Sequence, residues 1–176
     1  TPASLHVAPR NLTFAPATWS TPQTVVVRAN DDDVDSAASE PEAFTLTYAV
    51  ATTDTVFRGK ATDLVVVVRV LDNDTAAIRL NHSGEVLALT EGDAQGATMG
   101  ILGLASRPLA NVTLRVTSSL PQLITVSPAV LTVVRGAWNQ ATPTVQVRAL
   151  VGKYGGQVSS SITVTAESAD PKYNGL

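Results

Sequence analysis

Few side chains in this 176-residue chain are of the kinds that perform catalysis, and their spacing does not assemble a reaction centre. The two histidines, His6 and His82, are isolated, and neither has a plausible nucleophile partner. Ser159–Ser161 is a run of hydroxyls without a nearby base, which nucleophilic catalysis needs. Glu167 and Asp170 are paired carboxylates, but they fall at the end of an expected strand. We expect that the protein is not an enzyme.

Other binding chemistries are also missing from the sequence. The chain has no cysteine, which excludes a disulfide framework, a zinc–thiolate site and a thiol nucleophile. Gly92, Gly96 and Gly100 do not follow a strand and open a helix, as a phosphate-binding loop requires. The net charge of −3 argues against a nucleic-acid partner. The longest apolar run, Leu64–Val68, is far shorter than the roughly 18 residues of a membrane-spanning helix, so we expect no membrane insertion.

The composition predicts an all-β protein. The chain holds 24 Val and 22 Thr, and β-branched residues favour strands. Ten prolines and 11 glycines mark frequent turns, and no amphipathic helical pattern extends beyond two turns. Only 15% of the residues are charged, against roughly 25% in ordinary globular proteins. Short strands between closely spaced turn signals are typical of a β-sandwich.

An internal repeat organises the chain. Three stretches recur in the same order at offsets of 119, 120 and 116 residues. The matching pairs are Val7–Trp19 with Val126–Trp138, Val27–Ala29 with Val147–Ala149, and Leu46–Gly59 with Ile162–Gly175. Because Trp19 and Trp138 recur at the same repeat position, we interpret them as structural residues that close the end of a sandwich rather than as sugar-stacking platforms.

The repeat also predicts which strand faces are buried. In Thr24–Ala29, alternation places Val25, Val27 and Ala29 on one face, and all three have apolar counterparts in the second repeat. Leu64–Leu71 is apolar on both faces, which predicts a covered strand. Four further strands are expected, at Glu85–Thr90, Thr98–Leu104, Val112–Thr117 and Val130–Val134.

A boundary is expected near Asp74, between the end of one repeat at Leu71–Asp74 and the start of the next at Ala77–Leu80. Residues 1–74 then form the C-terminal part of a first repeat, and residues 75–176 form a second repeat without its last strand. Two explanations stay open: the segment is a window on a longer chain, or a neighbouring subunit supplies the missing strand by β-strand addition. The candidate donors are Leu64–Leu71 and Ser4–Ala8.

Several stretches resemble Calx-β-type modules of large repetitive extracellular proteins. The likeness rests on Leu12–Phe14, Trp19, Pro22–Val27, Asp31–Asp33, Leu71–Asp74, Thr90–Gly92 and Ser168–Leu176. The resemblance implies two tandem immunoglobulin-like Greek-key sandwiches, both incomplete within this segment. It also implies a place in cell-surface adhesins, matrix proteins or filaments.

The resemblance further implies calcium binding at one pole of the first repeat. The matching positions are Asp31, Asp32, Asp33, Asp35, Asp72 and Asp74. Calcium takes six to eight oxygen ligands, so clustered carboxylates suit it. The corresponding loop of the second repeat, Leu150–Gln157, contains no acid, and Glu91 alone would not hold the ion. The alternative is that Asn30–Asp35 is a solvated turn whose side chains cap backbone groups.

Four Asn-X-Ser/Thr triplets begin at Asn11, Asn73, Asn81 and Asn111, against about 1.4 expected by chance from this composition. Asn81 lies in an expected turn and is the best glycan acceptor, whereas Asn73 is the weakest. Used as N-glycosylation sites, these triplets make the protein a secreted eukaryotic product. In a bacterial surface protein they would have no meaning, and this alternative stays open.

The leading hypothesis is a structural subunit of an extracellular filament or surface fibre, whose partners are copies of itself. It requires no cofactor, although calcium in the first repeat and N-linked glycans are compatible with it. The alternative is a calcium-dependent cell-surface adhesin module that binds a glycan or receptor through the loop Asp31–Asp35.

Overall fold

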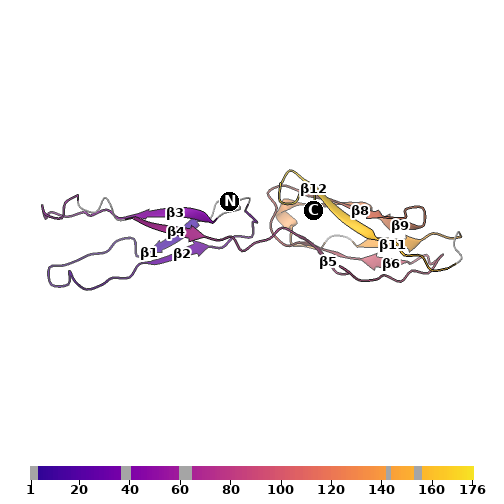
Figure 1. Cartoon of the computed structure of the whole chain (residues 1–176), viewed down its shortest axis with the longest axis horizontal. Helices are drawn as coiled ribbons and strands as arrows, with labels where there is room; N and C mark the ends of the chain where they lie inside the picture. The colour runs from indigo at the N-terminus through magenta and orange to yellow at the C-terminus, as the bar shows by residue number, and fades with distance from the viewer. Residues whose placement is uncertain (1–3, 37–40, 60–64, 142–143, 153–155) are drawn as a thin grey trace. The chain divides into compact units, whose positions relative to one another are not determined.

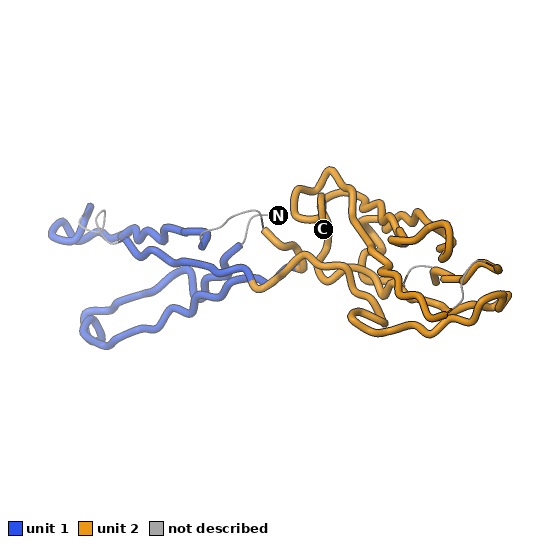
Figure 2. Tube along the Cα trace, turned by 45° about the vertical axis from the view of Figure 1, so that its right-hand side comes forward, with its two compact units in different colours: residues 1–32, 38–72 blue, residues 33–37, 73–176 orange. Residues whose placement is uncertain are grey.

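The computed structural model describes residues 4–36, 41–59, 65–141, 144–152 and 156–176. The described part is all-β, with one short 3₁₀ turn, η1 at Arg135–Ala137, as its helical element. The chain divides into two compact units (Figure 2). Unit 1 comprises Thr1–Asp32 and Ala38–Asp72, and unit 2 comprises Asp33–Ala37 and Asn73–Leu176. A short segment within the first sequence repeat therefore groups with unit 2.

The described residues of unit 1 form two antiparallel two-stranded sheets, whose strands are labelled in Figure 1. In one sheet β1 (Ser4–Ala8) pairs with β2 (Val26–Asn30). In the other sheet β3 (Glu42–Thr47) pairs with β4 (Val65–Val70). Val25 and Val27 are half-buried while Val26 is exposed, as the predicted alternation requires, but Ala29 of the same predicted face is exposed.

Within its described residues, unit 2 has two three-stranded sheets and one two-stranded sheet, with strand orders β10-β8-β12, β6-β11-β9 and β5-β7. All the pairings are antiparallel. The strands are β5 (Ile78–Leu80), β6 (Ala97–Met99), β7 (Ile101–Leu104), β8 (Val112–Ser118), β9 (Ile124–Ser127), β10 (Val130–Val133), β11 (Val145–Ala149) and β12 (Ile162–Ser168).

The core of unit 2 is built from both three-stranded sheets, as in a β-sandwich. Leu114 on β8 and Val133 on β10 come from one sheet, and Val145 and Val147 on β11 come from the other. Alternate residues along β8 are buried, because a half-buried strand turns every second side chain inward. The structure therefore confirms the all-β class and agrees with a sandwich-like packing of unit 2.

The two sequence repeats share one strand register. Val7 on β1 lies opposite Val27 on β2, and the matching residue Val126 on β9 lies opposite Val147 on β11. The valines of the first repeat lie on β1 and β2, and those of the second repeat lie on the corresponding strands β9 and β11, although the sequences between them differ. The self-similarity seen in the sequence is therefore also a similarity of strand pairing.

Two predicted strands differ from the structure. Glu85–Thr90 is not a strand: Leu87 and Leu89 pack against the core and Val86 is exposed, but no ladder partner pairs with the segment within the described residues. The predicted strand Thr98–Leu104 is divided into β6 and β7 at Gly100. A Cβ at Gly100 would lie 3.0 Å from Nδ2 of Asn81, so a glycine leaves room for that side chain.

The prediction that Leu64–Leu71 is covered on both faces is wrong for the described residues. Val65, Val66 and Val67 of β4 are all exposed. The physical reason is that β4 belongs to a two-stranded sheet in which β3 is its one neighbouring strand within the described residues, and no residue of this sheet belongs to the buried core cluster. Leu64 itself lies outside the described residues.

Candidate functional site

The six aspartates predicted to bind calcium are divided equally between the two units. Those of unit 1 are Asp31, Asp32 and Asp72, and those of unit 2 are Asp33, Asp35 and Asp74. Among the residues that the structure describes, which include all six, no group of three or more His, Cys, Asp or Glu side chains is placed to hold a metal ion. Calcium binding by the first repeat stays a prediction.

Asp35 uses both of its carboxylate oxygens within unit 2. Oδ1 forms an ion pair with Nζ of Lys172 at 2.8 Å, and Oδ2 accepts a hydrogen bond from the backbone N–H of Ala76 at 2.7 Å. The backbone oxygen of Asp33 accepts a hydrogen bond from the N–H of Arg107. Between these two aspartates, the side chain of Val34 is buried. This segment is therefore held by polar contacts, and its valine side chain is buried.

A tight turn built around an aspartate is found at corresponding positions of the two repeats. In unit 2, Oγ of Ser168 accepts from the N–H of Asp170 at 3.0 Å, and Oδ1 of Asp170 accepts from the N–H of Lys172 at 2.9 Å. In unit 1, Thr52 and Asp54 make the same two bonds, at 3.0 and 2.8 Å. Short polar side chains that bond the backbone two residues away are typical turn formers. The turn is a structural element that both repeats keep.

The turn of unit 2 is locked to a distant loop by Tyr173. Its hydroxyl donates to the backbone oxygen of Ser106 at 2.6 Å and accepts from the N–H of Ser106 at 3.1 Å. Oδ2 of Asp170 accepts from the N–H of Leu109 at 2.7 Å. Tyr173 is 1% exposed, whereas its counterpart in unit 1, Phe57, is 61% exposed. The Tyr173 hydroxyl and the Asp170 carboxylate of this corner are thus paired within the fold, whereas the buried Nε of Arg107 has no hydrogen-bond partner among the described residues.

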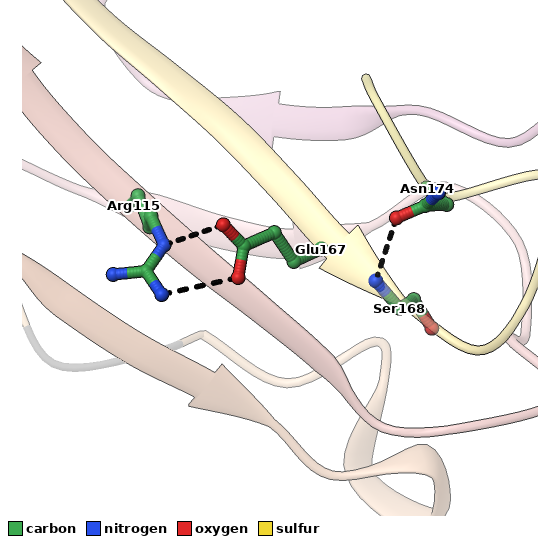
Figure 3. A network of polar contacts seen from close by, with 4 residues as sticks. All are labelled: Arg115, Glu167, Ser168 and Asn174. Carbon is green, nitrogen blue, oxygen red and sulfur yellow. Dashed lines mark hydrogen bonds and ion pairs between the residues drawn. The ribbon is translucent and has the colours of Figure 1, made fainter.

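An exposed charge pair joins β8 to β12 in unit 2 (Figure 3). Nε of Arg115 donates to Oε1 of Glu167 at 2.6 Å, and Nη2 donates to Oε2 at 3.1 Å. The hydrogen bonds from Arg115 hold the pKa of the Glu167 carboxyl below its ordinary value, and the pair raises the pKa of Arg115. The bidentate geometry explains both directions, because each partner stabilises the charged form of the other.

His82 has a carboxylate partner that sequence reasoning missed. Its Nδ1 lies 2.7 Å from Oε2 of Glu85, three residues along the chain. Both side chains are at the surface, next to the turn that follows β5. The signal that could have found the pair is the short spacing of His82 and Glu85 across Gly84. The pair orients the imidazole, and the expectation that the protein is not an enzyme stays a prediction.

All four predicted glycan acceptors, Asn11, Asn73, Asn81 and Asn111, are exposed. Oδ1 of Asn81 accepts from the N–H of Gly100 at 2.7 Å, and Oδ1 of Asn111 accepts from the N–H of Arg135 at 2.9 Å. Each of these bonds orients its side chain through the oxygen and does not use Nδ2, the atom to which a glycan is attached. Their glycosylation stays a prediction.

A shallow polar depression lies on β9 and β11. It is lined by Thr125, Ser127, Gln146 and Arg148, and a guanidinium nitrogen of Arg148 donates to Oε1 of Gln146 at 2.7 Å. The depression is open to solvent and its side chains are those of alternate, outward-facing strand positions. It offers hydrogen-bonding groups but no enclosed cavity.

Comparisons with known proteins add no assignment to this geometry. No family model matches the chain, and no curated protein or solved structure shows a significant match. Within the described residues, the chain has no helix long and apolar enough to cross a membrane.

Proposed function

We propose that the chain is a structural subunit of an extracellular filament or surface fibre, built from Calx-β-like, immunoglobulin-like Greek-key repeats. The observation that carries the proposal is that both repeats contain the same strand register and the same aspartate turn. The valine register on β1–β2 and β9–β11 and the turns around Asp54 and Asp170 are the same. Repetition of a scaffold is how elongated repeat proteins gain length.

The partners that we propose are further copies of the chain. Phe14 and Phe57 of unit 1 are exposed, whereas the matching residues of unit 2, Val133 and Tyr173, are buried. Large apolar side chains at core positions of a repeat favour an additional covering element. Head-to-tail β-strand complementation between subunits would provide it.

The edge most suited to such an assembly is that of β4. Within the described residues β4 pairs with β3 alone, and β1 pairs with β2 alone, so both segments predicted as donors already use one edge inside their own unit. The exposed run Val65–Val67 carries no charge to discourage pairing with another strand. We therefore propose that β4 joins a neighbouring subunit through its second edge, without leaving β3.

Sedimentation velocity over a concentration series tests this proposal. The wild-type chain is expected to form larger species as its concentration rises. Val67→Lys is expected to abolish them, because a lysine on an edge strand opposes strand addition. Val86→Lys is the matched control: it makes the same change at an exposed valine outside any strand and is expected to leave assembly intact.

A wild-type chain that sediments as a monomer at every concentration would overturn the proposal, as would a Val67→Lys variant that folds normally by circular dichroism and still assembles. The same samples discriminate the adhesin alternative. A monomeric chain whose melting temperature rises with calcium would favour a calcium-dependent binding module around Asp31–Asp35.

A further inference from the structure

The segment Asp33–Ser36 lies in the first sequence repeat but belongs to unit 2 by its contacts. Val34, flanked by aspartates, is only 5% exposed. Burial of an apolar side chain is favourable, and the contacts of this segment group it with unit 2, which follows in the chain. A segment of the first repeat is therefore bound by a surface of unit 2.

The surface that binds the segment has two backbone donors on separate loops of unit 2. The N–H of Ala76, just before β5, binds Oδ2 of Asp35, and the N–H of Arg107, after β7, binds the backbone oxygen of Asp33. Partly buried backbone N–H groups need an acceptor, and without the segment both of these would lose theirs. The segment therefore completes the hydrogen bonding of unit 2.

An ion pair adds selectivity for an acidic side chain to these two backbone hydrogen bonds. Nζ of Lys172, in the turn after β12, lies 2.8 Å from Oδ1 of Asp35, with side chains 34% and 14% exposed respectively. The carboxylate is thus held by a cation on one oxygen and by a backbone donor on the other. Such a charge-assisted arrangement is stronger than a neutral hydrogen bond, although the partial exposure of Lys172 weakens it.

The two sides of this contact do not recur at the corresponding repeat positions. At an offset of 120, Val34 and Asp35 correspond to Tyr154 and Gly155, which lack the valine and the carboxylate. At an offset of 116, Lys172 corresponds to Val56, which lacks the ammonium. The donor segment therefore occurs in one repeat and its charged receiver occurs in the other.

We propose that unit 2 carries a recognition surface for the Asp-Val-Asp segment of the preceding repeat, and that this contact, which we call the clasp, is specific to the junction between these two repeats. The partner that the surface fits is a short segment outside any strand, bound through the backbone oxygen of Asp33, the buried side chain of Val34 and the carboxylate of Asp35. Within the clasp Asp35 has a structural role, and its carboxylate is paired with the ammonium group of Lys172. It does not depend on the proposed filament, because every contact lies within one chain.

Hydrogen exchange of the intact chain, followed by NMR, tests the clasp. Asp35→Asn and Val34→Asp are expected to speed exchange of the Ala76 and Arg107 amides by about tenfold or more, because each removes part of the contact that protects them. The amides of Leu114 and Val116 on β8 are expected to be unchanged. Asp31→Asn, an equal charge change at an exposed aspartate, is the control and is expected to alter none of these rates.

A second variant separates the clasp from general destabilisation. Lys172→Met is expected to speed exchange at Ala76 but to leave Arg107 nearly unchanged, since Arg107 bonds a backbone oxygen. Unchanged exchange at both amides in Asp35→Asn and Val34→Asp would overturn the proposal. An equal rise at Ala76, Arg107 and the β8 amides in Asp35→Asn and Lys172→Met would also overturn it, because the segment would then be no more than one contact among many in the core.

Discussion

The hydroxyl of Tyr173 donates to the backbone oxygen of Ser106 at 2.6 Å, across 67 residues of sequence. Ser106 is fully buried, and its N–H and Oγ also bond this hydroxyl. One phenol therefore satisfies three polar atoms in the interior of unit 2. The first repeat has Phe57 at the matching position, exposed and without a hydroxyl.

Tyr173→Phe is expected to lower the free energy of unfolding by about 1–3 kcal/mol, because the ring stays while buried polar groups lose their partner. Urea unfolding measures the change. The reciprocal variant Phe57→Tyr is the control and is expected to leave stability within about 0.5 kcal/mol, since the ring is exposed. Equal effects of the two variants would contradict the role given to Tyr173.

Asp170→Asn is expected to destabilise unit 2 by about 2 kcal/mol. Both oxygens of Asp170 accept from backbone N–H groups, those of Leu109 and Lys172, and an amide nitrogen would face one of these donors. The equivalent change Asp54→Asn is expected to cost less, because the turn of unit 1 is exposed. Thermal unfolding of the two variants side by side checks the order, and a larger loss in Asp54→Asn would be inconsistent with it.

The Arg115–Glu167 pair predicts a pH dependence with a defined sign. The pKa of Glu167 is lower in the folded chain than its ordinary value, so the pair stabilises the fold above that ordinary value. This contribution is lost as the pH falls through the folded pKa. Arg115→Gln is expected to raise the pKa of Glu167 in an NMR titration, whereas Arg79→Gln at an exposed position on β5 is not. If the pKa of Glu167 does not change in Arg115→Gln, the pair is ruled out as the cause of its lowered value.

N-glycosylation is expected at the exposed sequons when the chain is secreted by eukaryotic cells. Asn81 should carry a glycan, since its Nδ2 is not used in the bond from Gly100. Glycopeptide mass spectrometry measures the occupancy, with Ser83→Ala as a variant that destroys the sequon and keeps the asparagine. Native material without any modified asparagine would favour the alternative of a bacterial surface protein.

The features that the sequence predicted well are those with local, periodic causes. Alternating valines indicated β2 and β11, and the repeat aligned Val27 with Val147, which the structure places opposite Val7 and Val126 respectively. Val112–Thr117 was predicted as a strand for the same reason and differs from β8 by one residue. In these segments, side-chain alternation and ladder pairing agree.

The features that sequence reasoning missed depend on contacts between distant residues. Glu85–Thr90 has the alternation of a strand, but burial of Leu87 and Leu89 does not require a ladder partner. Likewise, Asp35 looked like a member of an acidic loop, whereas its partners Ala76 and Lys172 follow it by 41 residues or more. No local pattern could have placed those atoms together.

The central claim is that the protein forms fibres from repeated modules, and electron microscopy of the native material tests it most directly. The account predicts regular fibres whose width is that of one row of sandwich modules and whose mass spectrum shows this chain as the repeating subunit. Monodisperse, unassembled particles at the same concentration would contradict it.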